Sequence, residues 1–412
     1  MGATADETTL RQYLSFFFGQ QVSLLGSSIS QFAIVWWINL ETASAMYLSL
    51  AALVGFAPMV VLGFFTGVIA DRFNRKAIIA LADSAQALIT VALIAFFMMG
   101  FASIGVVLFL LFLRGVCQAF HMPTVGAIVP SMVPRDKLSR INSLGYVFNG
   151  VVSMAGPVIA AILLAFLSID QILWVDPATF LVSIAILLLI RIPSVRQDIK
   201  PTFRQDFAQG LSLIRRARGL LTLIFLATVL NFLLTPLMTL LPYFIRFDHF
   251  GNAGDLALVE AVLQGGLLVG GIKMLSISGF KRKIPAFIAA CIIIFIGYAV
   301  VSFTPTGWVW FMAAAMLILG VPLPAANVSV STIVQVVVPL EFQGRVGAVI
   351  GSLSSLATPL GMIMAGALAG VVGTANLFLG SALAGVVVLI LAWLLTDVRH
   401  VEDLQATAGT AS

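Results

Sequence analysis

The chain has 412 residues, of which 60% are hydrophobic and only 9% are charged, whereas about a quarter of the residues in an ordinary soluble domain are charged. Its mean hydropathy is +1.10. These values exclude a soluble enzyme, a nucleic-acid-binding module and a disordered chain, and the recurrence of apolar stretches along nearly the whole length predicts a polytopic helical membrane protein.

Twelve apolar segments are each long enough for a membrane-spanning helix, which needs about 20 mostly apolar residues. In chain order, the predicted spans are residues 13–37, 46–69, 77–99, 103–122, 142–167, 172–190, 219–244, 256–276, 285–304, 308–328, 346–370 and 374–396. Glycine and proline occur inside many of them, and membrane helices tolerate these residues better than soluble helices do. We therefore predict an all-α fold with twelve transmembrane helices.

The basic residues are distributed unevenly among the connections between these spans. If the N-terminus is cytoplasmic, 19 of the 22 Lys and Arg residues lie in inner connections and tails, whereas Arg246 lies in an outer connection and Arg114 and Lys273 lie within spans. Basic residues concentrate on the cytoplasmic side of membrane proteins. The pattern predicts a multi-pass protein of the cell membrane with both termini in the cytoplasm.

The longest polar stretch, residues 191–218, divides the chain into six spans within residues 1–190 and six within residues 219–412. The second part of this linker places four apolar residues at helical spacing: Phe203, Phe207, Leu211 and Ile214. This spacing predicts an amphipathic helix that lies on the inner membrane surface, with a plain solvated linker as the alternative.

An internal repeat supports the division into two halves. The segment Val133-Pro134-Arg135-Asp136, followed by Arg140, recurs 205 residues later as Val338-Pro339-Leu340-Glu341, followed by Arg345. At the same offset Gly115 matches Gly320, and Gly156 matches Gly361. Two pseudo-symmetric six-helix halves are typical of a secondary transporter with its binding site between the halves near mid-membrane.

The connection between the second and third spans contains a motif, Gly67-Val68-Ile69-Ala70-Asp71-Arg72-Phe73-Asn74-Arg75-Lys76. It closely resembles the GxxxDRxxRK signature of the major facilitator superfamily. The resemblance implies a latch that holds one face closed and breaks as the halves rock, formed by Gly67, Asp71, Arg72, Arg75 and Lys76, with Asp136 as an acidic partner. Gly67 allows close helix approach, and Asp71 can face the N-terminus of a helix in the other half. The alternative is that the motif serves only as a topology signal.

Further segments resemble the macrolide-efflux branch of drug:proton antiporters. They are Gly19-Gln20-Gln21-Val22-Ser23-Leu24, Gln31, Thr42-Ala43-Ser44-Ala45, Ala82-Asp83-Ser84, Leu113-Arg114-Gly115, Ala119-Phe120-His121-Met122-Pro123 and Gly344-Arg345-Val346. The resemblance covers nearly the whole chain and implies a monomeric secondary active exporter. Such a protein exchanges amphipathic, macrolide-like drugs for protons by alternating access. Siderophore or lysophospholipid transport by the same fold is the alternative.

Four ionisable residues within or near the spans are candidates for proton coupling: Arg114, Asp176, Glu260 and Asp83. A charge in the middle of a membrane helix costs about 2.5–3.5 kcal/mol on insertion scales, so Arg114 should face the bundle interior with a partner. The resemblance matches Arg114 to the span-four arginine that is linked to proton transfer in antiporters. A fixed structural ion pair, or acids that simply lie at the membrane interface, remain the alternatives.

Uncharged polar residues inside the spans are the candidates for a substrate pocket: Gln31, Asn149, Asn231 and Gln264. A few polar groups among aromatic and flexible apolar side chains suit large amphipathic ligands, although such residues also form hydrogen bonds to neighbouring helices. In the fifth span, Gly150, Gly156 and Pro157 resemble part of the glycine-proline motif of antiporters. Ordinary helix packing and a proline kink are the alternative reading.

The sequence lacks the motifs that nucleotide-driven transport and metal binding would require. No GxxxxGK[ST] phosphate loop is present, so ATP is not the predicted energy source. The two cysteines, Cys117 and Cys291, and the three histidines, His121, His249 and His400, are too scattered for a predicted metal site. We therefore expect a transporter that uses no cofactor, metal or nucleic acid and is not an enzyme.

Overall fold

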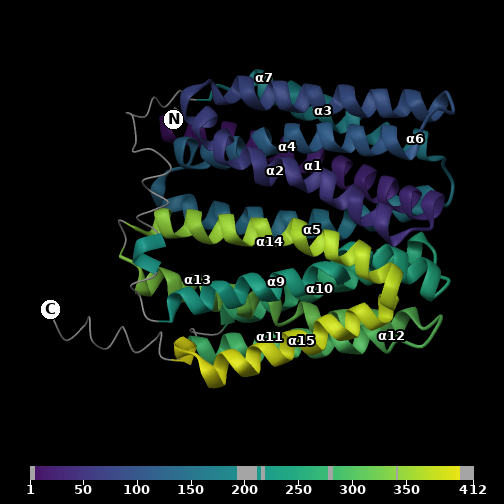
Figure 1. The fold of residues 1–412 in the computed structure, drawn as a ribbon. Helices are drawn as coiled ribbons and strands as arrows, with labels where there is room; N and C mark the ends of the chain where they lie inside the picture. Colours follow the sequence, from purple (N-terminus) through teal and green to yellow (C-terminus); the bar gives the residue numbers. More distant parts are fainter. Residues whose placement is uncertain (1–4, 193–210, 215–218, 277–281, 340–341, 400–412) are drawn as a thin grey trace. The chain divides into compact units, whose positions relative to one another are not determined.

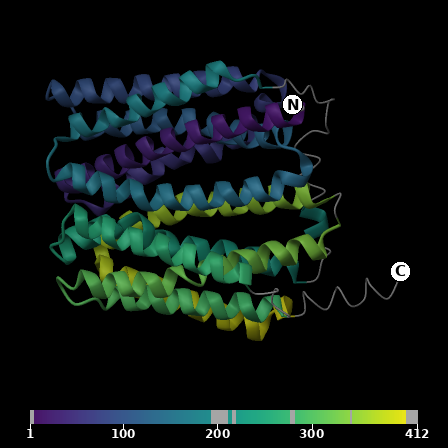
Figure 2. The same cartoon turned by 180° about the vertical axis from the view of Figure 1, so that it is seen from behind.

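The computed structural model describes residues 5–192, 211–214, 219–276, 282–339 and 342–399, and every regular element in these ranges is a helix. The chain divides into two compact units, Met1–Ile199 and Lys200–Ser412. Figure 1 shows the helices of each unit, and Figure 2 shows them from behind.

The first unit contains α1 (Ala5–Thr42), α2 (Ala45–Arg72), α3 (Arg75–Met98), α4 (Ile104–Met132), the short 3₁₀ helix η1 (Arg135–Lys137), α5 (Leu138–Leu164), α6 (Ile169–Leu173) and α7 (Val175–Leu189). The second unit contains α9 (Leu220–Tyr243), the π-helical turn η2 (Phe244–Asp248), α10 (Ala253–Ser276), α11 (Lys283–Ser302), α12 (Val309–Gly320), α13 (Leu323–Val337), α14 (Gln343–Val372) and α15 (Thr374–Leu395).

Twelve helical segments in the described residues are long and apolar enough to cross a membrane, as the sequence predicts. Three of them combine successive elements, because α6 continues into α7, α9 into η2 and α12 into α13. The fourth span does not end at residue 122, since α4 continues through Pro123 and Pro130 to Met132. Neighbouring helices and local adjustments satisfy the backbone groups that proline frees, so a proline need not end a membrane helix.

Equivalent helices pack together in the two units. In the first unit α2 packs on α4, α1 on α5 and α7, and α3 on α4 and α7. In the second unit α10 packs on α12, α9 on α14 and α15, and α11 on α12 and α15. Each unit therefore has the same internal arrangement of six spans.

The repeated glycines lie at equivalent close contacts between helices. A Cβ atom at Gly115 of α4 would meet the backbone of Gly55 on α2, and a Cβ at Gly320 would meet the Leu263 carbonyl oxygen on α10 at 2.6 Å. Gly156 likewise lies against Ser28 of α1. Small residues allow membrane helices to approach closely, which explains why the repeat preserves glycine at these positions.

The described part of the linker contributes to the core of the second unit. Residues 211–214 are helical, and Ile214 is buried with Leu220 and Val338. The other apolar positions of the predicted amphipathic helix, Phe203 and Phe207, lie outside the described residues.

Candidate functional site

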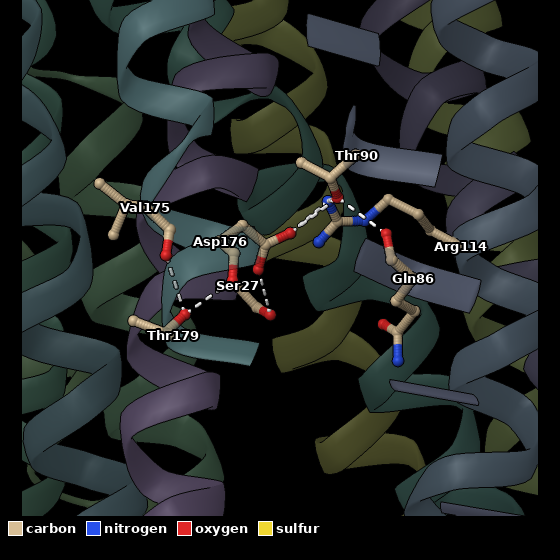
Figure 3. Close-up of polar contacts among 7 residues, drawn as sticks. All are labelled: Ser27, Gln86, Thr90, Arg114, Val175, Asp176 and Thr179. Atoms are coloured by element: carbon tan, nitrogen blue, oxygen red, sulfur yellow. Dashed lines mark hydrogen bonds and ion pairs between the residues drawn. The ribbon is translucent and has the colours of Figure 1, made fainter. Parts of the chain in front are cut away.

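An ion pair lies inside the first unit between Arg114 of α4 and Asp176, the second residue of α7. Nη1 of Arg114 is 2.7 Å from Oδ2 of Asp176, and the two side chains are 9% and 0% exposed. Figure 3 shows the guanidinium and the carboxylate facing one another. A buried charge is tolerated only with a well-placed partner, and each of these side chains supplies the partner that the other requires.

Two hydroxyl groups complete the surroundings of this pair. Ser27 Oγ of α1 donates to Oδ1 of Asp176 at 2.8 Å, and Thr90 Oγ1 of α3 accepts from Nη1 of Arg114 at 2.6 Å. Thr90 Oγ1 is also 2.9 Å from Oδ2 of Asp176 and 3.0 Å from the Gln86 carbonyl oxygen, and its single proton serves one of these two acceptors at a time. The carboxylate therefore has partners on both oxygens, in a network with four helices (Figure 3).

A second polar contact in the same unit joins Asp83 of α3 and His121 of α4. His121 Nε2 lies 3.0 Å from Oδ1 of Asp83, and the two side chains are 12% and 1% exposed. Neither ring nitrogen makes a hydrogen bond of good geometry to another described residue. Gln20 Nε2 of α1 donates to Oδ2 of Asp83 at 3.4 Å and to Ser183 Oγ of α7 at 2.9 Å. Asp83 is one of the predicted candidates for proton coupling, whereas no role is predicted for His121.

The two contacts form parallel layers across the same four helices. The residues of the arginine layer are Ser27, Thr90, Arg114 and Asp176. The residues of the histidine layer are Gln20, Asp83, His121 and Ser183. On each of α1, α3, α4 and α7 the two members are seven residues apart, which is about two helical turns or about 10 Å. The seven-residue spacing is therefore the sequence signal that could have identified His121.

A cavity of about 280 Å³ borders the arginine layer inside the first unit. Its lining includes Arg114, the predicted pocket residue Gln31, and the amides of Gln86 and Gln118. The Gln118 Oε1 atom is buried without a hydrogen-bond partner among the described residues. The cavity thus exposes polar groups of α1, α3 and α4 next to the ion pair.

The other predicted pocket residues lie apart from this cavity. Asn149 of α5 accepts a hydrogen bond from Gln21 Nε2 at 3.2 Å. Asn231 Nδ2 donates to the Ala227 carbonyl of its own helix at 3.0 Å. Gln264 and the predicted proton acceptor Glu260 lie half-buried on α10 of the second unit.

Two basic residues of the predicted latch, Arg75 and Lys76, bind backbone carbonyls within the first unit. Arg75 Nη1 donates to the Ala127 carbonyl of α4 at 2.8 Å. Lys76 Nζ donates to the carbonyls of Leu188 and Ile190, at 2.9 and 2.7 Å. The last carbonyls of a helix lack donors and favour a cation, so Lys76 caps the end of α7.

The other residues of the predicted latch and packing motifs lie on α2, η1 and α5. Gly67, Asp71 and Arg72 lie in α2, and their side chains are outside the described residues, whereas Asp136 is exposed on η1. On α5, Gly156 and Pro157 are buried and Gly150 is half-buried. The described residues contain no group of three or more His, Cys, Asp or Glu side chains that could hold a metal ion.

Comparisons with known proteins place these features in a family. The sequence profile described as Major Facilitator Superfamily matches residues 16–362. The chain is 27% identical to "Macrolide efflux protein A" of Streptococcus pyogenes over 397 residues, which cover 95% of this chain and 97% of that protein. It is 24% identical to "Multidrug efflux pump Tap" of Mycolicibacterium fortuitum over 92% of this chain and 94% of that protein.

Among solved structures, a bacterial homologue of the human lysosomal transporter Spinster, in an inward-facing and unoccupied conformation, has the same fold. It superposes with a TM-score of 0.71 at 16% sequence identity, covering 98% of this chain and 99% of that chain. The twelve-span arrangement therefore agrees with that of a solved transporter.

Proposed function

The chain belongs to the major facilitator superfamily, and on that premise we propose that it exports amphipathic, macrolide-like compounds in exchange for protons by alternating access. The comparisons support a membrane transporter related to macrolide and multidrug efflux proteins. We propose in addition that the coupling ion is the proton, that transport is outward and that the substrates are macrolide-like.

The buried ion pair beside a cavity carries this proposal. An arginine keeps its charge at any physiological pH, so Asp176 is the member of the pair whose charge a proton can change. Protonation of Asp176 removes the attraction that holds Arg114 and leaves a cation at the cavity wall. A proton and a substrate in the cavity would then act on the same side chain, as an exchange mechanism requires.

The two halves differ at this position, which supports a functional role for the charge. The residue equivalent to Arg114 in the sequence repeat is Leu319, a buried residue of α12. A charge required only by the six-helix architecture would be expected in both halves. We therefore assign proton coupling mainly to the first unit, with Glu260 of α10 as the remaining acidic candidate in the second.

The cavity lining supports an amphipathic substrate. Leu24, Leu111 and Val152 line it together with Gln31 and several hydroxyl groups. This mixture of apolar and polar side chains suits a ligand that has both kinds of surface. The names of the relatives make a macrolide the first compound to test.

The remaining assignments follow from the charge pattern and the repeat. We propose that the protein lies in the cell membrane as a monomer with both termini in the cytoplasm. Residues 191–218 would connect functional halves at 1–190 and 219–412. The motif from Gly67 to Lys76, with Asp136, would act as a latch between conformations.

Transport of labelled erythromycin in a pump-deleted bacterium tests the proposal. Cells with the protein should accumulate less drug than empty cells, and an uncoupler should abolish the difference. Asp176→Asn should behave like wild type treated with the uncoupler, whereas Asp170→Asn on α6 serves as a matched control and should export normally. Unchanged accumulation, with the protein present in the membrane, would contradict macrolide export and direct the assay to siderophores and lysophospholipids.

A further inference from the structure

We propose that Asp83 and His121 form a second proton-binding site, and that one proton passes between this site and Asp176 during the transport cycle. The proposal rests on the function proposed above and extends it to a histidine that the superfamily motif in the sequence does not include. His121 lies within the predicted span 103–122 and within α4, a helix long and apolar enough to cross a membrane. An ionisable residue in such a span is a candidate functional group by default.

The matched register of the two layers is the first argument. Each layer contains one basic side chain of α4 facing one aspartate, with Arg114 paired to Asp176 and His121 to Asp83. The partner helices are different, since Asp176 belongs to α7 and Asp83 to α3. The helix α4 therefore carries two basic residues about 10 Å apart, and each faces an acid on a neighbouring helix.

The two basic residues differ in what they can do with a proton. Arg114 remains charged, so in the arginine layer only the carboxylate can bind and release a proton. In the histidine layer the carboxylate and the imidazole are both groups that can bind and release a proton. The histidine layer is thus able to hold a proton on either partner.

The net charge of the two layers defines how many protons they exchange. With His121 neutral, one cation (Arg114) faces two carboxylates (Asp83 and Asp176), which leaves one negative charge in a buried environment. One bound proton makes the set neutral, and uncompensated charge is costly at low dielectric. The two layers together therefore favour one exchangeable proton.

The transfer step moves only this proton. It leaves the carboxyl oxygen of Asp176, restores the negative charge that pairs with Arg114, and binds Nε2 of His121 or a carboxylate oxygen of Asp83. The reverse transfer restores the starting state. No other bond forms or breaks.

Two residues that lie between the layers along α3 and α4 have polar amide side chains. Gln86 lies between Asp83 and Thr90 on α3, and Gln118 lies between Arg114 and His121 on α4. Both amides line the cavity of about 280 Å³, and a water molecule needs about 30 Å³ and a few polar partners. The unpartnered Gln118 Oε1 supplies one such partner between the two proton sites.

The other ionisable groups on the packed helices can be named from the sequence. Lys76 on α3 and Tyr13 on α1 lie one seven-residue step beyond the histidine layer, and Lys76 caps α7. The remaining ones on α1 to α5 and α7 are Asp6, Glu7, Arg11, Glu41, Tyr47, Asp71, Arg72, Arg75, Cys117, Arg140 and Tyr146, in addition to Arg114 and Asp176. Of these, Cys117 lies one turn from His121 on α4, and Arg75 binds a backbone carbonyl.

Histidine nitrogen NMR on the purified protein tests the site without any substrate. The chain has three histidines, so the variant H249Q/H400Q leaves His121 as the single labelled imidazole. We expect its ring nitrogens to change protonation between pH 5 and pH 9. Adding Asp83→Asn should lower the titration midpoint by one pH unit or more, because it removes the adjacent anion. An imidazole that does not titrate in this range, or a midpoint that Asp83→Asn leaves in place, would overturn the proposal.

Transport in proteoliposomes tests the role of His121 in coupling. We expect His121→Gln to reduce accumulation of labelled erythromycin driven by a proton gradient at least tenfold, and to retain exchange of labelled for unlabelled erythromycin without a gradient. The control His249→Gln should retain both activities. Full gradient-driven accumulation by His121→Gln would refute the second site. If the wild-type protein shows no gradient-driven accumulation, the proposed function is refuted instead. The NMR titration would still decide whether Asp83 and His121 bind a proton.

Discussion

Arg114 and His121 lie on one face of α4, two helical turns apart, and each contacts an aspartate that belongs to a different neighbouring helix. Arg114 reaches Asp176 on α7, and His121 reaches Asp83 on α3. The helix α4 therefore makes polar contacts with two neighbouring helices at two levels along its axis. Changes in protonation at either depth would alter how α4 is held.

Removing only the basic member of the ion pair should destabilise the protein. Arg114→Leu, which introduces the residue found at the equivalent position 319, leaves Asp176 buried without a counter-charge. The expected loss is about 3–5 kcal/mol, measured as a fall in the melting temperature of the purified protein in detergent. The double variant R114L/D176N should recover most of the lost stability but remain unable to couple transport to protons. Equal stability of the single and double variants would contradict a stabilising ion pair.

The Thr90 hydroxyl should matter more than the shape of its side chain. Thr90→Val keeps the volume but removes the oxygen that accepts from Arg114 at 2.6 Å. Leaving a buried charged donor with one partner fewer should cost about 1–3 kcal/mol and slow proton-driven export. Thr90→Ser keeps the hydroxyl and should retain most of the stability and the activity. A serine variant as impaired as the valine variant would show that the methyl group dominates.

Gly115→Ala should destabilise the contact between α2 and α4. A Cβ atom there would lie 3.1 Å from the carbonyl carbon of Gly55 and 3.1 Å from Cγ of Pro58, so the helices would have to separate. Such overpacking typically costs about 1–3 kcal/mol. Gly126→Ala on the same helix is the matched control, because a Cβ there meets no atom within 4 Å and alanine favours the helix by up to about 1 kcal/mol. Melting temperatures that fall equally for both variants would contradict this explanation.

The stability of the protein should depend on pH partly through His249, which lies in the connection after η2. Its side chain is 5% exposed, and its ring packs on Phe244 with centroids 4.4 Å apart. Burial lowers the pKa of His249 below the ordinary value, although a hydrogen bond to the Pro305 backbone opposes this effect.

As the pH is lowered, His249 therefore binds a proton at a higher pH in the unfolded chain than in the folded protein. Stability should begin to fall as the pH drops below about 6.5, the ordinary histidine pKa, and this loss should end once the pH passes the lower folded pKa. His249→Gln should show a smaller fall in melting temperature between pH 7.5 and pH 5. An unchanged pH dependence in this variant would assign the effect to other groups.

Composition and spacing were sufficient to predict the twelve spans and the repeat. A run of apolar residues must enter the membrane as a helix, because an unpaired backbone cannot remain there. The ends of the spans were less predictable. The fourth span is predicted to end at residue 122, yet α4 continues through Pro123 to Met132, because packed helices support the residues around the proline.

The polar sites could be predicted only in part. The cost of a buried charge predicted that Arg114 faces the interior with an acidic partner, but the choice among Asp83, Asp176 and Glu260 depends on how each helix is rotated. No role is predicted for His121, because its contact with Asp83 likewise depends on how α3 and α4 are rotated. The two layers are related by seven residues backwards along α3, from Thr90 to Asp83, and by seven residues forwards along α4, from Arg114 to His121.

The order of synthesis has a consequence for the buried ion pair. Asp176 follows Arg114 by 62 residues, and at a synthesis rate of 5–20 residues per second the arginine waits roughly 3–12 s for its carboxylate. Thr90 on α3 is already available and can accept the first hydrogen bond from the guanidinium. The first half therefore cannot complete its assembly in the bilayer before α7 emerges, and a nascent chain arrested after α5 should be a substrate for membrane quality-control proteases.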